Sequence, residues 1–246
     1  MTSMKVTVLG RWGPYPARGG ACSGYLVECG ETKIVLDLGN GTLSRLQEYC
    51  GLDEVDCLVL SHLHPDHSAD ALVLRYALAL GGERQTLRCL VPPEPEGLVR
   101  DLNYEDAYEI ESAVEGVTHR VGEVQVDFIR NRHMLPCVAT RLECKGVSLV
   151  YTADTGYFAD LVGFARGADL LIAEANLLEE HVCHVKGHMS GGQAAKVASE
   201  AGVDRMLLTH IFPEFDPNQV LSEANALFPR CELAEEGRRY EIGLAR

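Results

Sequence analysis

The sequence lacks the cysteine patterns that mark disulfide scaffolds and structural zinc sites. It contains nine cysteines, and no C-x-x-C pair occurs among them. Several lie inside apolar runs, as Cys57 does in VDCLVL. A chain of this length can bury a sizeable core without a disulfide framework. We therefore expect the cysteines to be reduced core residues in a reducing compartment.

Long apolar runs are also missing. The longest apolar stretch, ALVLRYALAL, is interrupted by Arg75 and is too short to span a bilayer. The segment MTSMKVTVLGRWGPYP holds too short an apolar run for a signal peptide. We therefore expect a cytoplasmic protein that has no membrane partner.

Basic residues are scarce. The chain has 22 Lys and Arg against 36 Asp and Glu, which gives a formal net charge of −14. Proteins that bind nucleic acids usually present a basic face, so this balance argues against a nucleic-acid partner. It does not forbid one, because bound divalent cations can make a single cleft positive.

The segments that are present predict a layered α/β protein. The 246 residues suit a single domain, 1–246, and no repeat or long linker interrupts them. Short apolar runs between glycines predict strands, and apolar residues at helical spacing predict helices. The expected strands are 4–10, 24–30, 32–39, 55–61, 87–91, 122–133, 137–144, 147–154 and 205–210. The expected helices are 41–51, 68–82, 190–202 and 217–228, with a helix leading into a strand over 158–175 and a mixture of helix and loop over 94–120. Two sheets packed between helices account for this order.

The strongest motif is SHLHPDH, which directly follows the strand predicted at 55–61. It contains His62, His64, Asp66 and His67. Residues 62 and 64 lie two apart in extended chain, so their side chains point the same way. Asp66 and His67 open the next helix and can face a second position nearby. Neutral imidazoles and carboxylates are the ligands that divalent transition metals prefer, so the motif predicts a metal site.

Three further residues follow the ends of predicted strands, as His62 does. They are His133, Asp154 and His210. Side chains at such positions converge when the strands end at one edge of the sheets. They therefore add ligands for a pair of metal ions.

Taken together, these residues resemble the metallo-β-lactamase superfamily of binuclear metal hydrolases, with all five motif positions in the family's order. The resemblance implies a four-layer αββα sandwich with the site at one edge of the two sheets. It implies two divalent metal ions, zinc first, with manganese or iron as alternatives. The implied ligands are His62, His64 and His133 for the first ion, Asp66, His67 and His210 for the second, and Asp154 as the bridge.

Such a pair of cations acidifies a water molecule and stabilises charge on the attacked centre, so hydrolysis is the expected chemistry. Asp66 is both an implied ligand and an orienter of the attacking water. A bridging carboxylate such as Asp154 gives an oxygen-rich site, which suits phosphoryl oxygens.

The segment around His188 resembles the ribonuclease Z branch of the superfamily. That resemblance implies that His188 is a catalytic acid that protonates the leaving oxygen, paired with Glu174 at the end of a strand. Ser190 and Gln193 have the spacing of a helix capping box, and the free N–H groups of that helix terminus suit a phosphate. We interpret His181 and His184 as surface residues or rim contacts.

The chain departs from ribonuclease Z between His133 and Asp154. Those enzymes carry a long arm there to hold transfer RNA, whereas this segment is just long enough for a hairpin. We therefore expect a small anionic substrate, a small or cyclic phosphodiester. In the loop 10–20, Arg11 and Arg18 are interpreted as solvated residues, with substrate contact as the alternative.

Three alternatives remain open from the sequence. One is hydrolysis of a carboxylic ester, thioester, lactone or sulfate ester by the same metal pair. Another is a ribonuclease Z-like RNA endonuclease. The last is a binding protein without catalysis, which the intact ligand set disfavours. Dimers are common in the resembled family, so a homodimer is also an expectation.

Overall fold

The computed structural model describes residues 3–81 and 86–243. Its strands form two seven-stranded sheets with the orders β14-β1-β2-β3-β4-β5-β6 and β13-β12-β11-β10-β9-β8-β7. The first sheet contains β1 (Met4–Gly10), β2 (Gly24–Cys29), β3 (Thr32–Leu38), β4 (Cys57–Val59), β5 (Leu87–Val91), β6 (Tyr108–Ser112) and β14 (Arg239–Ile242). The second contains β7 (His119–Val121), β8 (Val124–Arg130), β9 (Val138–Cys144), β10 (Val147–Tyr151), β11 (Leu170–Glu174), β12 (Arg205–Thr209) and β13 (Cys231–Leu233).

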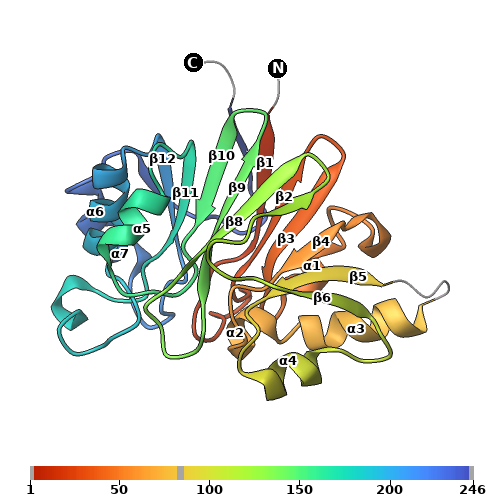
Figure 1. The fold of residues 1–246 in the computed structure, drawn as a ribbon. Coiled ribbons are helices and arrows are strands. Elements are labelled where there is room, and N and C mark those ends of the chain that lie inside the picture. Colours follow the sequence, from red (N-terminus) through yellow and green to blue (C-terminus); the bar gives the residue numbers. More distant parts are fainter. Residues whose placement is uncertain (1–2, 82–85, 244–246) are drawn as a thin grey trace.

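Helices cover the outer face of each sheet (Figure 1). The first sheet is covered by α1 (Thr42–Leu46), α3 (Ala71–Leu80) and α4 (Glu96–Leu102). The second is covered by α5 (Ala159–Phe164), α6 (Gly191–Ala201) and α7 (Pro217–Asn225). The short elements α2 (Pro65–Ser68), η1 (Leu52–Glu54) and η2 (Glu179–His181) lie in connections. The αββα sandwich expected from the sequence is confirmed.

The central strands are apolar on both faces because each face packs against another layer. In β3, Ile34 and Leu36 enter the core between the sheets, whereas Val35 enters the core beneath the outer helices. In β10, Leu149 belongs to the core between the sheets and Val150 to the outer core. Burial on both faces explains why these strands read as continuous apolar runs rather than alternating ones.

The prediction for residues 94–120 was wrong in part. The helix α4 lies there, but so do the edge strands β6 and β7, which were expected as helix or loop. In β6, whose sequence is YEIES, only Tyr108 is buried and the other residues are half-buried or exposed, because an edge strand needs less apolar surface than a central one. The edge strands β13 and β14 were likewise absent from the prediction.

The prediction that every cysteine is reduced was also wrong. Cys29 and Cys144 form a disulfide that joins the last residues of β2 and β9, across the core between the sheets. The two cysteines lie 115 positions apart in the sequence, so no local spacing announces the pair. The other seven are free thiols. Cysteine content therefore gives no argument for a reducing compartment.

The sequence predicts that the protein has no membrane partner, and the helices of the structure bear on this prediction. Within residues 3–81 and 86–243, none of the helices combines the length and the apolarity that crossing a bilayer requires.

The strand directions bring the polar residues of both sheets to one edge. β3 and β4 are parallel neighbours in the first sheet, and β10, β11 and β12 are parallel neighbours in the second. Carboxyl ends of parallel strands lie at the same edge, so the loops that follow them meet there. Three of the non-glycine residues with positive φ lie at this edge, namely Asp37, Ala153 and His210, with φ values of 55°, 49° and 53°.

Candidate metal centre and its catalytic pair

The first group of site residues consists of three imidazoles and one carboxylate. His64 Nδ1 lies 2.9 Å from His62 Nε2 and 3.1 Å from His133 Nε2. Asp154 Oδ2 closes the group at 3.7 Å from His62 Nε2 and 3.9 Å from His133 Nε2. One ring nitrogen from each histidine thus points at a common centre.

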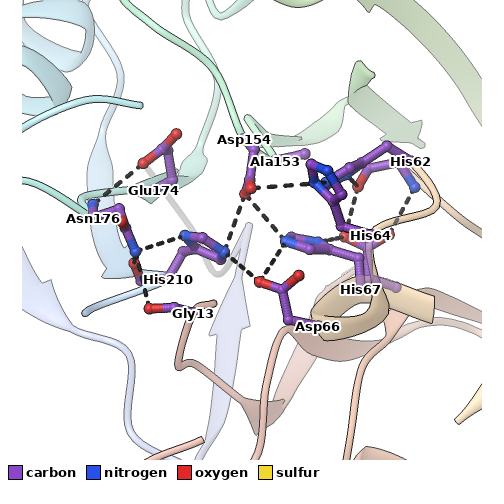
Figure 2. A network of polar contacts seen from close by, with 12 residues as sticks. Gly13, His62, His64, Asp66, His67, Ala153, Asp154, Glu174, Asn176 and His210 are labelled. Carbon is purple, nitrogen blue, oxygen red and sulfur yellow. Dashed lines mark hydrogen bonds and ion pairs between the residues drawn. The ribbon is translucent and has the colours of Figure 1, made fainter. Parts of the chain in front are cut away.

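The second group shares Asp154 with the first. Asp154 Oδ1 lies 3.1 Å from His67 Nε2 and 3.3 Å from His210 Nε2. Asp66 Oδ2 lies 3.0 Å from His210 Nε2 and 3.6 Å from His67 Nε2. The two oxygens of Asp154 therefore face different groups, and Figure 2 shows this carboxylate between the imidazoles of both.

These donor atoms fit a pair of divalent metal ions. The His67 Nε2 and Asp154 Oδ1 atoms are buried and make no hydrogen bond of acceptable geometry, although they are 3.1 Å apart. Buried polar atoms almost always have a hydrogen-bond partner, so lone pairs directed at one shared point indicate metal ligands. The donors are nitrogen and oxygen throughout, whereas structural zinc sites usually contain cysteine.

Asp37 orients the histidine rings of this cluster through hydrogen bonds. The sequence analysis did not identify it. Its buried carboxylate accepts hydrogen bonds from His67 Nδ1 (2.7 Å), Ser61 N (2.7 Å), Ser61 Oγ (2.8 Å) and the Tyr151 hydroxyl (2.7 Å). Because Asp37 holds a proton on His67 Nδ1, Nε2 is the ring atom that faces the second group and can bind an ion. The available signal was a carboxylate inside the apolar strand TKIVLDL, since a buried Asp needs a set of donors.

Two other rings are oriented by similar contacts. His133 Nδ1 donates to the Gly187 carbonyl at 3.0 Å, and Nε2 faces the other donors of the first group. His62 Nδ1 lies 3.0 Å from the Ser61 hydroxyl, which itself donates to Asp37. The carboxylate of Asp37 thus acts on both groups, directly on His67 and through Ser61 on His62.

His210 is fixed by its backbone and by tight packing. The Asn176 side chain donates to the carbonyls of His210 and Gly13, each at 3.0 Å (Figure 2). A Cβ atom on Gly13 would lie 2.0 Å from His210 Nε2, so only glycine fits against this ring. The loop that contains Gly13 therefore forms one wall of the site.

Burial and neighbouring charges set the protonation of the cluster in the metal-free protein. Burial would raise the pKa of Asp154, but His210 and His67 outweigh it and hold that pKa well below its usual range. Burial holds the pKa of His62 well below its ordinary value. Burial would also lower the pKa of His67, yet the Asp154 and Asp37 carboxylates raise it well above its ordinary value. An ionised carboxylate between the rings is what a bridging ligand requires.

His188 and Glu174 meet beside the cluster, as the sequence predicted. His188 Nδ1 lies 3.0 Å from Glu174 Oε1, and the same oxygen accepts from Thr155 N at 2.7 Å. The His188 ring stacks on the His210 ring, with centroids 5.5 Å apart. Burial would lower the pKa of His188, but the Glu174 carboxylate outweighs it and raises the pKa to about 9.

Sequence and structure comparisons place this geometry in a family. The model of the β-lactamase superfamily domain matches residues 25–211.

The chain belongs to the β-lactamase superfamily.

Two relatives match this chain along almost their whole length. The chain is 33% identical to the probable metallo-hydrolase YhfI of Bacillus subtilis, over 97% of this chain and all of the relative. The crystal structure of YhfI superposes with a TM-score of 0.92 at 31% identity, over 98% of this chain and 100% of that one. A ribonuclease Z of Methanopyrus kandleri is 28% identical over 95% of this chain and 96% of its own. The predictions of the superfamily and of a metallo-hydrolase are confirmed.

Membership in the superfamily also bears on the expected partners. Proteins named ribonuclease Z are among the relatives, so the comparisons give no support to the prediction that nucleic acid is not a partner. The comparisons do not test the prediction that the protein has no membrane partner or the prediction of a homodimer.

The remaining predicted residues of this superfamily member lie outside both groups. His181 stacks on Phe215 with ring centroids 5.2 Å apart, and His184 is exposed. The Arg11 guanidinium donates to the Ala234 carbonyl at 2.7 Å, so it has a structural contact. Arg18 is exposed.

The capping box that opens α6 is confirmed, with a difference at the helix terminus. The Ser190 hydroxyl accepts from Gln193 N, as expected. It also contacts the Glu179 carboxylate, which approaches the position that a Cβ on Gly192 would take. An acidic residue of the chain itself therefore occupies this terminus, which was expected to be free for a phosphate. The local sequence of α6 gives no sign of this, because Glu179 comes from η2.

Proposed function

We propose that this metallo-hydrolase of the β-lactamase superfamily holds two divalent metal ions and hydrolyses a phosphodiester of a small or cyclic anionic substrate. The observation that carries the proposal is Asp154, whose two carboxylate oxygens face two separate groups of donors. His62, His64 and His133 would hold one ion, and Asp66, His67 and His210 the other. The preponderance of imidazole favours zinc, with manganese and iron as the alternatives.

The side chains of the site divide the work. When bound, the two ions supply Lewis acidity and a water of lowered pKa. Asp66 lies at the cluster with its carboxylate directed inward, so it can accept a hydrogen bond from the attacking water as well as hold an ion. His188 supplies the proton of the leaving oxygen. Because Glu174 engages Nδ1, the proton is delivered from Nε2.

Two features favour a phosphodiester over an acyl substrate. The carboxylate of Asp154 would give both ions an oxygen ligand, which suits phosphoryl oxygens. His188 stands beside the cluster as a proton donor, which a phosphodiester with an alkoxide leaving group requires. Carboxylic esters, thioesters, lactones and sulfate esters belong in the same assay panel as competitors.

The proposal of a small substrate rests on the short segment between His133 and Asp154. His133 and Asp154 are connected by β9 and β10 alone, which form a hairpin. The chain carries a net charge of −14, whereas RNA binding needs Lys and Arg contacts to phosphates. RNA cleavage is the second candidate, because the full-length match to a ribonuclease Z favours it.

Action in the cytoplasm and a single domain over 1–246 stay predictions.

The experiment compares leaving groups that differ in their need for a proton. Metal-loaded protein is assayed on ethyl 4-nitrophenyl phosphate and on ethyl phenyl phosphate. His188→Ala should keep both metal ions and lose about 100-fold or more in kcat on the phenyl ester, since general acid catalysis contributes about 10²–10⁴-fold. It should lose far less on the nitrophenyl ester, whose leaving group needs little protonation. Equal losses on both esters would remove the acid role.

A substrate panel separates the bond classes. The same protein is given a carboxylic ester, a lactone, a sulfate ester, a 3′,5′-cyclic nucleotide and a transfer RNA precursor. Turnover of the cyclic nucleotide well above that of the acyl and sulfate esters is expected. Faster cleavage of the RNA would replace the small substrate by the second candidate.

A further inference from the structure

A cavity opens next to the catalytic pair, and the roles described so far do not use it. Its volume is about 480 Å³. His133 and His188 line its inner side, next to the metal cluster, together with Gly156 and Gly187. The rest of its lining consists of Arg132, Met134, Tyr157, Val182, Val185, Lys186 and Gln193. Anything that occupies it lies within reach of the His188 ring.

The charge of the cavity is opposite to that of the whole chain. Arg132 and Lys186 line it and are exposed, and no carboxylate is among its described lining residues. In the described part of the chain, no carboxylate oxygen lies within 4.0 Å of either cation. The backbone of Arg132 is nevertheless fixed, because its N–H donates to Thr155 Oγ1 at 3.1 Å and its carbonyl accepts from Gly156 N at 3.0 Å. A cavity lined by two cations and by no described carboxylate, on a chain of net charge −14, favours an anionic ligand.

The other walls of the cavity are apolar. Met134 is 81% exposed and Val185 is 41% exposed, although both are large hydrophobic residues. The Tyr157 ring is held in place by Lys196, which lies 4.4 Å from its centroid, and by its hydroxyl, which donates to Glu200 at 2.9 Å. A flexible methionine beside a fixed aromatic ring suits an apolar or planar group of variable shape.

The position of His188 decides which part of a substrate enters. Its Nδ1 is engaged by Glu174, so only Nε2 is available to a leaving oxygen. The cavity lies on the side of His188 that it shares with His133 and Gly187. The group attached to the leaving oxygen is therefore the part that this space receives.

We infer that the cavity is the leaving-group subsite, and that it selects phosphodiesters whose leaving alcohol carries a second anion on an apolar or aromatic body. The second anion is a carboxylate or a phosphate, bound by Arg132 and Lys186. Met134, Tyr157 and Val185 contact the body. The inference rests on the proposed function, because it assigns the leaving group to the side of His188.

The kinetic test uses two esters that differ only in that charge, ethyl 3-carboxyphenyl phosphate and ethyl 3-carbamoylphenyl phosphate. The ratio of their kcat/KM values is measured in the wild type, in Arg132→Gln and in Arg100→Gln. Arg100 lies in α4, is exposed, and provides the same change of net charge away from the cavity. The ratio should fall about tenfold in Arg132→Gln and stay unchanged in Arg100→Gln, because a guanidinium binds carboxylate through charge-assisted hydrogen bonds.

An unchanged ratio in Arg132→Gln, with both esters hydrolysed, would overturn the subsite and leave the proposed function standing. Failure to hydrolyse any phosphodiester would overturn the proposed function instead. A binding measurement then decides the subsite without catalysis. In protein labelled at the methionine methyl groups, 3-hydroxybenzoate should shift the Met134 signal, which is assigned by its loss in Met134→Leu. 3-Hydroxybenzamide should shift it less, and no shift with the benzoate would overturn the subsite.

Discussion

Replacing Asp37 by Asn tests how the protein prepares His67 for a metal ion. In the wild type, Asp37 Oδ2 accepts from His67 Nδ1 at 2.7 Å, so the lone pair of Nε2 faces Asp66 and Asp154. The other oxygen accepts from Ser61 N. In Asp37→Asn the amide oxygen keeps that contact, and the amide nitrogen then faces His67 Nδ1. Two donors cannot share a hydrogen bond, so the ring changes tautomer and its Nε2 carries a proton that blocks an ion.

The expected magnitude follows from the kind of contact removed. Loss of a carboxylate behind a metal-binding histidine costs about 10–100-fold in metal affinity. Each tenfold change corresponds to about 1.4 kcal/mol, so the expected cost is about 1.4–2.8 kcal/mol. The ion at His67 should lose more than the ion at His62, which feels Asp37 only through Ser61.

The assay is a competition between metal-stripped protein and a chromophoric chelator, which resolves two binding steps. Tyr151→Phe is the matched control, because it removes one hydrogen bond to Asp37 and keeps its charge. We expect the affinity for the ion at His67 to fall about 10–100-fold in Asp37→Asn. In Tyr151→Phe it should fall less than about threefold. Wild-type affinity for both ions in a folded Asp37→Asn protein would refute the reasoning.

Three other outcomes follow from the same contacts. Gly13→Ala places a Cβ 2.0 Å from His210 Nε2, so the affinity for one of the two ions should fall at least about tenfold in a metal-binding measurement. Two tightly bound ions in this variant would show that the His210 ring moves aside without losing its ion. Cys29→Ser should lower the free energy of unfolding in urea by about 2–4 kcal/mol, and reductant should bring the wild type to the same value. Equal stability of oxidised wild type and variant would speak against the Cys29–Cys144 bond. In metal-free protein, the NMR titration of His188 should give a pKa of about 9 rather than 6.5. Its stabilising contribution should thus be present below pH 6.5 and be lost as the pH rises through about 9, and a measured value at or below 6.5 would contradict the pairing.

The cluster of candidate ligands could be predicted from the sequence because its members follow the ends of strands. His62, His133, Asp154 and His210 come after apolar runs, and the structure brings them together with the rest of SHLHPDH. Strand direction alone carries such residues to one edge. The sandwich follows for a similar reason, since strands buried on both faces read as apolar runs.

The features that escaped prediction depend on contacts between distant segments. Asp37 is a lone carboxylate in a strand, and its donors come from Ser61, His67 and Tyr151, which no spacing connects. Glu179 reaches the terminus of α6 only because η2 folds back onto it. The edge strands β6, β7, β13 and β14 have short or half-exposed sequences that resemble loops. Pairing with a neighbour, rather than their own composition, makes them strands.

The most direct test of the binuclear site is an anomalous-scattering crystal structure of the protein loaded with zinc or manganese. We expect two peaks about 3.5–4 Å apart. One should lie among His62, His64 and His133, and the other among Asp66, His67 and His210, with Asp154 in contact with both. A single peak, or peaks away from Asp154, would contradict the account.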